Sequence, residues 1–120
     1  MAAFADALRQ IADRVPETHV LMLMGTDGIP IDRLMIQADP NIEAVAAEFT
    51  TLLRASVSAA SDTGLGNLLE LCVITEKMTA LLHGITEDYY LFAALEPGAL
   101  IGRARFALRL AGLALEREFR

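Results

Sequence analysis

The sequence predicts an α+β fold whose elements follow the order α-β-β-α-β-β-β-α. Apolar residues recur at helical spacing in three segments, and five shorter apolar runs are bounded by turn residues such as Gly, Asp and Thr. Only the connection through the middle helix is long, so we expect one five-stranded antiparallel sheet with helices covering both faces. No internal repeat or linker interrupts this order, and residues 1–120 are expected to form a single domain.

The chain begins with a predicted helix and hairpin. An apolar stripe at helical spacing is formed by Phe4, Ala7, Leu8, Ile11 and Val15. The pattern stops at Pro16, which marks the end of the helix. The apolar run from Val20 to Met24 and the segment from Ile29 to Ile36 then predict two paired strands, with Asp27 and Gly28 supplying the turn between them.

The middle helix is predicted from Pro40 to Asp62, with Asp39 as its N-cap. Its broad apolar side is expected to pack on the sheet and contains Ile42, Val45, Phe49, Leu52, Leu53 and Val57. The opposite side is a stripe of small residues, namely Ala44, Ala47, Thr51, Ala55 and Ser58. Such a stripe would let another helix approach closely. The alternative is that these are ordinary surface residues, because alanine has a high helix propensity.

The second half of the chain predicts three strands and a helix. A helix stop at Gly64-Leu65-Gly66 precedes the strands, which are expected at Asn67–Thr75, Met78–Ile85 and Tyr89–Leu95. Short turns at Glu76-Lys77 and Glu87-Asp88 favour an antiparallel meander. The last helix opens after Pro97-Gly98 and runs to about Glu118. Its polar stripe is narrow, so this helix is expected to be covered on most sides.

Composition favours a protein that associates with a second chain. Hydrophobic residues make up 54% of the sequence and mean hydropathy is +0.42, so apolar surface is expected to be hidden by self-assembly. The formal net charge of -6 argues against nucleic acid or an anionic membrane as the main partner. No apolar run is long enough for membrane insertion and no signal peptide is recognisable, so a cytoplasmic protein is expected.

Residues that carry chemistry are sparse. The single cysteine, Cys72, lies in an apolar run and is expected to be a small core residue. His19 and His83 have no ligand-spaced partners, so neither a metal nor a cofactor is expected. Asp27 is expected to stabilise its turn, and a solvated charge is favoured for Arg54 over an inserted catalytic arginine. The sequence has no Gly-x-x-x-x-Gly-Lys-Ser/Thr loop and predicts a protein that is not an enzyme.

These elements resemble the roadblock/dynein light chain family, whose profilin-like domain has the same order. The resemblance covers about residues 3 to 118, and its most recognisable part is the first hairpin, from Val20 through Asp27-Gly28 to Pro30-Ile31. It implies a non-enzymatic homodimer that binds a Ras-like small GTPase and modulates its GTP cycle, or that serves as a scaffold. In bacterial members similar to this chain, the dimer contacts a polarity or motility GTPase and can stimulate its hydrolysis.

The resemblance also implies where contacts form. In the family, central helices pair and third strands join edge to edge, and an unpaired apolar edge strand would be an aggregation hazard. On this sequence the expected dimer interface contains Ala44, Ala47, Thr51, Ala55, Ser58, Leu69, Leu71 and Val73. Flanking residues expected to contact the GTPase are Glu43, Glu48, Thr50 and Arg54.

A second interpretation of the same fold remains open. Related profilin-like sheets bind ligands between sheet and helix, so the chain could be a small-molecule-sensing or signalling scaffold module. Four methionines could line such a cavity, namely Met22, Met24, Met35 and Met78. Methionines at these positions are more often ordinary core residues.

Overall fold

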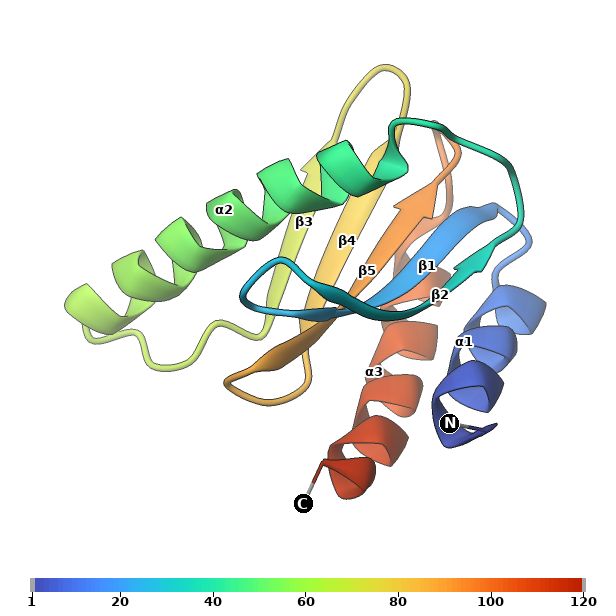
Figure 1. The fold of residues 1–120 in the computed structure, drawn as a ribbon. Helices are drawn as coiled ribbons and strands as arrows, with labels where there is room; N and C mark the ends of the chain where they lie inside the picture. The colour runs from blue at the N-terminus through green and yellow to red at the C-terminus, as the bar shows by residue number, and fades with distance from the viewer. Residues whose placement is uncertain (1, 120) are drawn as a thin grey trace.

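A computed structural model describes residues 2–119 of the chain (Figure 1). Its elements are α1 Ala2–Arg14, β1 Thr18–Gly25, β2 Pro30–Met35, α2 Ile42–Asp62, β3 Glu70–Ile74, β4 Thr79–Gly84, β5 Tyr89–Leu95 and α3 Ile101–Glu118. The strands form one sheet of order β2-β1-β5-β4-β3, in which every neighbouring pair is antiparallel. The predicted order of elements and the five-stranded antiparallel sheet are confirmed.

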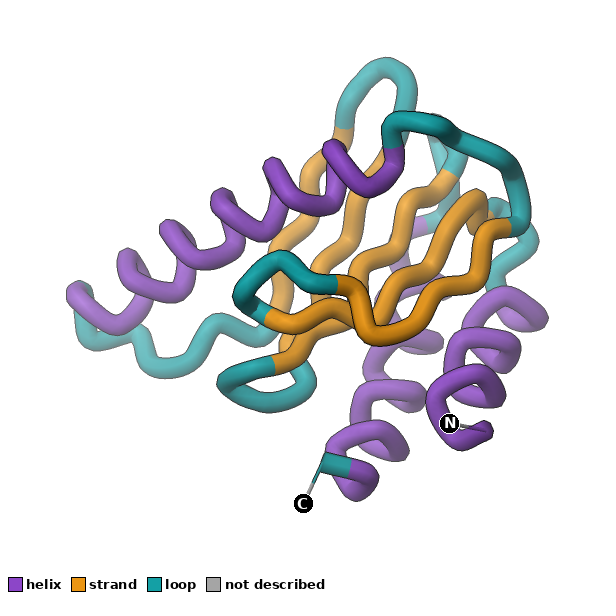
Figure 2. Tube along the Cα trace, viewed as in Figure 1, coloured by secondary structure: helices purple, strands orange, loops and turns teal. Residues whose placement is uncertain are grey.

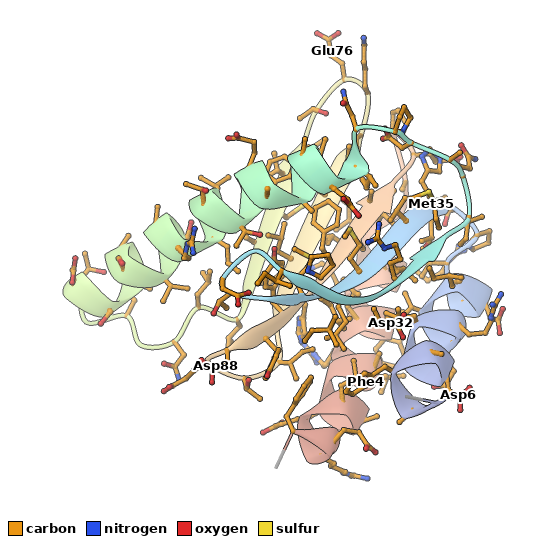
Figure 3. All side chains as sticks on the ribbon, viewed as in Figure 1. Phe4, Asp6, Asp32, Met35, Glu76 and Asp88 are labelled. Carbon is orange, nitrogen blue, oxygen red and sulfur yellow. The ribbon has the colours of Figure 1, made fainter. Side chains whose placement is uncertain are left out.

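The sheet separates two hydrophobic clusters. Figure 2 shows α2 alone on one face, with α1 and α3 together on the other. Residues of β1 alternate between the two faces: Leu21 and Leu23 belong to the α1/α3 cluster, while Met22 and Met24 belong to the α2 cluster. This strand is therefore buried on both sides, which explains why its sequence is continuously apolar. On the α1/α3 side, Phe4, which is labelled in Figure 3, stacks on Phe119.

Two turns have the predicted chemistry. The Asp27 carboxylate accepts a hydrogen bond from the Ile29 N–H at 3.0 Å and so holds the β1–β2 turn. At the end of α2, Gly64 adopts a φ of 73°, and the Leu65 N–H donates to the Ala60 carbonyl at 2.8 Å. This glycine conformation and the backward hydrogen bond are the usual way in which a helix is terminated.

The start of α2 differs from the prediction. The helix begins at Ile42, after a turn in which the Asp39 carboxylate accepts the Asn41 N–H at 2.9 Å. Asp39 therefore caps the turn before the helix and does not cap the helix itself. The predicted start at Pro40 was two residues early, because Pro40 belongs to this turn.

Two residues of the predicted core side of α2 are exposed, namely Leu52 and Val57. Ala46 and Thr50 are buried in their place, together with Ile42 and Leu53. For Val57, Figure 1 shows the physical reason: the C-terminal end of α2 extends past β3, where no strand lies beneath it. The helix is thus longer than the sheet is wide at this edge. Leu52 instead lies on the side of the helix away from the sheet, because the next residue, Leu53, is the one buried against it.

Cys72 is also not the core residue that the sequence suggested. It lies on β3, an edge strand, and its side chain is exposed. Leu71 and Val73 point to the α2 cluster, so Cys72 between them points to the other face of the sheet. No helix covers that face at β3, and an apolar run there does not imply burial.

The far edge of the sheet is irregular. The β1–β2 register shifts between Leu23 and Met24, and Met24 pairs with Pro30. Proline has no N–H to offer to a further strand. The β2 edge therefore differs from the regular β3 edge.

Candidate partner-binding surfaces

The small-residue stripe of α2 is open to solvent. All five of its residues are exposed in the chain: Ala44, Ala47, Thr51, Ala55 and Ser58. They lie on the side of the helix opposite Ala46 and Leu53, which pack against the sheet. Leu52, which is 42% exposed, borders this stripe and adds a large apolar side chain to it. The structure leaves the stripe available to another helix.

One flank of α2 is held by the chain's own first hairpin. Glu43 forms an ion pair with Arg33 of β2, and the Arg54 guanidinium donates to the Thr26 carbonyl at 3.1 Å. Both pairs are exposed, so each stabilises the fold only weakly. They show that Glu43 and Arg54 face the β1–β2 hairpin, whereas Glu48 lies exposed beside the stripe. The predicted partner-binding residues therefore do not form one continuous surface.

Thr50 is not part of the partner-binding surface, contrary to the prediction. Its relative exposure is 0%, and its hydroxyl donates to the Ala46 carbonyl at 2.7 Å and is hydrogen-bonded to the Tyr90 hydroxyl. Burial raises the pKa of Tyr90, so the phenol stays neutral in this bond. Thr50 connects α2 to the central strand β5, and no partner can reach it.

The backbone of β3 is half unpaired. Along the β3–β4 ladder, the Gly84 N–H donates to the Leu69 carbonyl and the Thr75 N–H donates to the Met78 carbonyl. Because hydrogen-bonded pairs alternate in an antiparallel ladder, Leu71 and Val73 also direct their backbone groups toward β4. The N–H and C=O groups of Glu70, Cys72 and Ile74 then point away from the sheet, and β3 is at its edge.

The side chains expected at the β3 contact behave in two ways. Leu71 and Val73 are half-buried against the α2 cluster. Leu69 is 73% exposed just before the strand, although it belongs to an apolar run. Leu69 is thus free for a contact with a second chain, while Leu71 and Val73 mainly support α2.

Solved structures of other proteins share this arrangement. The fold is similar to that of the gliding protein MglB from Thermus thermophilus, with a TM-score of 0.86, 16% identity, and coverage of 97% of this chain and 87% of that one. A roadblock/LC7 domain from Streptomyces avermitilis gives a TM-score of 0.82 at 16% identity, with 94% of both chains covered. MglC from Myxococcus xanthus gives 0.72 at 26% identity, covering 97% and 98%. No family model and no curated protein sequence matches.

The chain has the roadblock fold. The resemblance predicted from its sequence is confirmed by these structures. In this fold α2 packs on the sheet face to which Leu71 and Val73 of β3 point, while its small-residue stripe faces away from the sheet. Sequence reasoning had missed the exposed Leu52 and the unpaired backbone row of Glu70, Cys72 and Ile74 as open surfaces. Only the β3–β4 register, which a single sequence does not specify, identifies that row.

A groove of about 850 Å³ lies under the C-terminal half of α2. It is lined by residues of α2, of the loops before β3 and after β4, and of β5, including Leu53, Val57, Leu68, Ile85 and Tyr89. The methionines do not meet there. Met22 and Met24 are buried in the core, Met35 is exposed on β2, and Met78 is half-buried against the α2 cluster. The expectation that four methionines could line one cavity was wrong, because they lie on separate parts of the sheet.

Within residues 2–119, no three His, Cys, Asp or Glu side chains come together as a metal site would require. None of the helices in this part of the chain is both long enough and apolar enough to cross a membrane.

Proposed function

We propose that this roadblock chain is a homodimeric, non-enzymatic regulator or scaffold that binds a Ras-like small GTPase and modulates its GTP cycle. The carrying observation is that the chain leaves two surfaces open to a second copy, the exposed small-residue stripe of α2 and the unpaired backbone edge of β3. An isologous contact needs such a self-complementary surface. The likeness to MglB and MglC supports this proposal, because those proteins have the same fold over nearly their whole length.

The unpaired row of β3 favours one register for the proposed dimer. A two-fold axis at Cys72 pairs Cys72 with Cys72 of the second copy and Glu70 with Ile74, so all outward N–H and C=O groups on that row are used. Shifting the axis to Leu71 or Val73 loses one of these hydrogen-bonded pairs. The central register therefore satisfies the most backbone groups.

This register makes a prediction about the native thiol. Hydrogen-bonded residues on opposite antiparallel strands have Cα atoms about 5.5 Å apart, so a short bis-maleimide will link the two Cys72 side chains in the dimer. We expect a covalent dimer on a denaturing gel within minutes at micromolar protein. The matched control is Cys72→Ser with Leu65→Cys, which moves the thiol to the exposed α2–β3 loop. Equal yields from both proteins would exclude the central register.

The proposed function is tested by nucleotide turnover. We expect the purified chain to release no phosphate from GTP or ATP, because it lacks a phosphate loop, and to change GTP turnover when a cognate small GTPase is added. Phosphate release and nucleotide exchange are measured with and without the chain. Turnover by the chain alone, or no effect on and no binding to any small GTPase encoded beside it, would contradict the proposal.

Reversing two charges on α2 tests where the GTPase binds. Glu43 and Glu48 remain exposed after Thr50 is excluded, and such rim charges raise association rate more than residence time. The variant Glu43→Lys with Glu48→Lys should bind the GTPase more slowly, with a weaker or reversed salt dependence. Asp6→Lys with Asp13→Lys on α1 changes the net charge equally, both sites being exposed, and should leave the rate nearly unchanged. If both variants behave alike, the GTPase contacts neither the Glu43 flank nor the Glu48 flank of the stripe.

The groove under α2 favours a second candidate function, a small-molecule-sensing or signalling scaffold. Its volume of about 850 Å³ falls within the usual range for ligand pockets, and its lining combines apolar side chains such as Leu53 and Ile85 with polar ones such as Thr26 and Asn67. A ligand seated there would raise Tm in the absence of any GTPase, and this distinguishes the sensor from the regulator.

A further inference from the structure

The outer face of α3 carries large apolar side chains. Phe106 is 54% exposed, Leu110 is 38% exposed and Leu113 is 55% exposed. Their spacing of four and three residues places them on one side of the helix. The opposite side is already used in the core, by Ala104, Ala107, Leu108, Ala111 and Leu115. A solvated face of a helix is normally polar, so this one is suited to being covered.

The same helix is positively charged in an acidic protein. Between Ile101 and Leu115 it contains Arg103, Arg105 and Arg109 and no acidic residue, whereas the whole chain has a net charge of -6. Arg105 is paired with Glu70 of β3 at 2.6 Å. Arg109 forms no ion pair with any residue in the described part of the chain, so its charge is uncompensated.

A groove runs between α3 and the β3–β4 edge. Its volume is about 610 Å³, and its lining includes Leu69, His83, Phe106 and Arg109. Gly102, also in the lining, has open space where a side chain would be. His83 is kept neutral by burial and by Arg109, which lower its pKa against the opposing effect of Glu70. We call this region, together with Phe106, Leu110 and Leu113, the α3 groove.

We propose that the α3 groove binds an acidic amphipathic helix of a partner protein. The apolar side of such a helix would cover Phe106 and Leu113, and its carboxylates would meet Arg109 and the exposed side of Arg105. The surface from Gly102 to Leu113 is about three helical turns long, which matches a helix of about 12 residues packed along α3. A helix laid in an apolar groove is a common form of peptide recognition.

Charge decides between this partner and the alternatives. A second copy placing its own α3 here would bring arginines together, which opposes association. An anionic membrane would attract α3 but repel a chain whose net charge is -6. The α3 groove lies on the face of the sheet opposite α2 (Figure 1), so the proposal does not depend on how α2 is used, although the groove shares Leu69 with the β3 edge proposed for the dimer.

The experiment selects, from a displayed library of helical peptides of about 12 residues, those that bind the full chain. One selected peptide is then synthesised, and its affinity for the chain is measured by fluorescence anisotropy. We expect winners with Asp or Glu beside apolar residues at helical spacing, and binding that weakens with salt. Two variants should each raise the Kd of this peptide roughly tenfold or more. One is the double variant Phe106→Ser, Leu113→Ser, and the other is Arg109→Glu. The matched controls Ile29→Ser and Arg9→Glu replace exposed residues away from α3 and should stay within about twofold.

Several outcomes would overturn the proposal. These are the absence of winners, winners without acidic residues, and winners that bind the α3 variants unchanged. If the chain sediments with phosphatidylglycerol vesicles and the Phe106→Ser, Leu113→Ser double variant does not, the groove binds a membrane. If that double variant forms a smaller assembly than the unaltered chain, the groove binds a second copy. The Glu43→Lys, Glu48→Lys variant should still bind the peptide. The peptide result can therefore be judged even if the proposed binding of a GTPase fails its own test.

Discussion

Replacing Ala47 and Ala55 together by arginine will leave the protein monomeric at micromolar concentrations, where the unaltered chain is expected to be a dimer. Both positions are exposed on the stripe, and two-fold symmetry would bring four new guanidinium groups into one contact. Juxtaposed like charges cost several kcal/mol, so we expect Kd to rise roughly a hundredfold or more. Light scattering and sedimentation measure the mass, and circular dichroism checks that the helices are intact.

The control for this experiment places the same charges elsewhere. Ala5→Arg with Gln10→Arg adds two arginines to exposed positions of α1 and should leave the mass unchanged. Arginine is a good helix former, so neither double variant should unfold its helix. A dimer that persists with Arg at positions 47 and 55 would show that the stripe is ordinary surface.

Replacing Thr50 by aspartate will lower the free energy of unfolding by about 3 kcal/mol or more, because it buries an unpaired carboxylate. The new group would lie against the Ala46 carbonyl, to which the Thr50 hydroxyl now donates. The Tyr90 hydroxyl, which is now hydrogen-bonded to Thr50, could donate to this carboxylate but has no positive charge to offset it. Urea unfolding followed by circular dichroism gives the difference from the unaltered chain.

The neighbouring threonine is the matched control. Thr51→Asp has the same cost in helix propensity, but Thr51 is exposed, so the change should stay within about 0.5 kcal/mol. Both variants are unfolded at two protein concentrations, so that any contribution of dimerisation to the measured stability appears as a concentration dependence. Equal losses at the two positions would place Thr50 back on the surface.

Most of the fold was predictable because its signals are local. The Asp27-Gly28 turn, the glycine stop after α2 and the alternation of apolar runs each depend on a few neighbouring residues. The β1 strand was predictable for a further reason: it is buried on both faces, so its continuous apolar run had only one interpretation. The resemblance to the roadblock family then placed α2 and β3 at the candidate contact.

Two of the errors share one cause, which is that a local stretch of sequence does not specify how wide the sheet is. Val57 and Cys72 have core-like side chains, yet they lie at or beyond the β3 edge, where the opposing layer ends. Thr50 shows the reverse case. A threonine in a run with Ala46 is compatible with either side of a helix, and only the Tyr90 hydroxyl on another element explains its burial.

The unlike edges of the sheet also determine how large an assembly can grow. A chain with two equally receptive edges could add copies without limit and form a fibre. Here the β3 edge offers a regular row of backbone groups, while the β2 edge has a register shift at Met24 and a proline at position 30. Polymerisation along the sheet would therefore stop once two β3 edges have paired, because the β2 strand at each end is poorly suited to pair with a further strand.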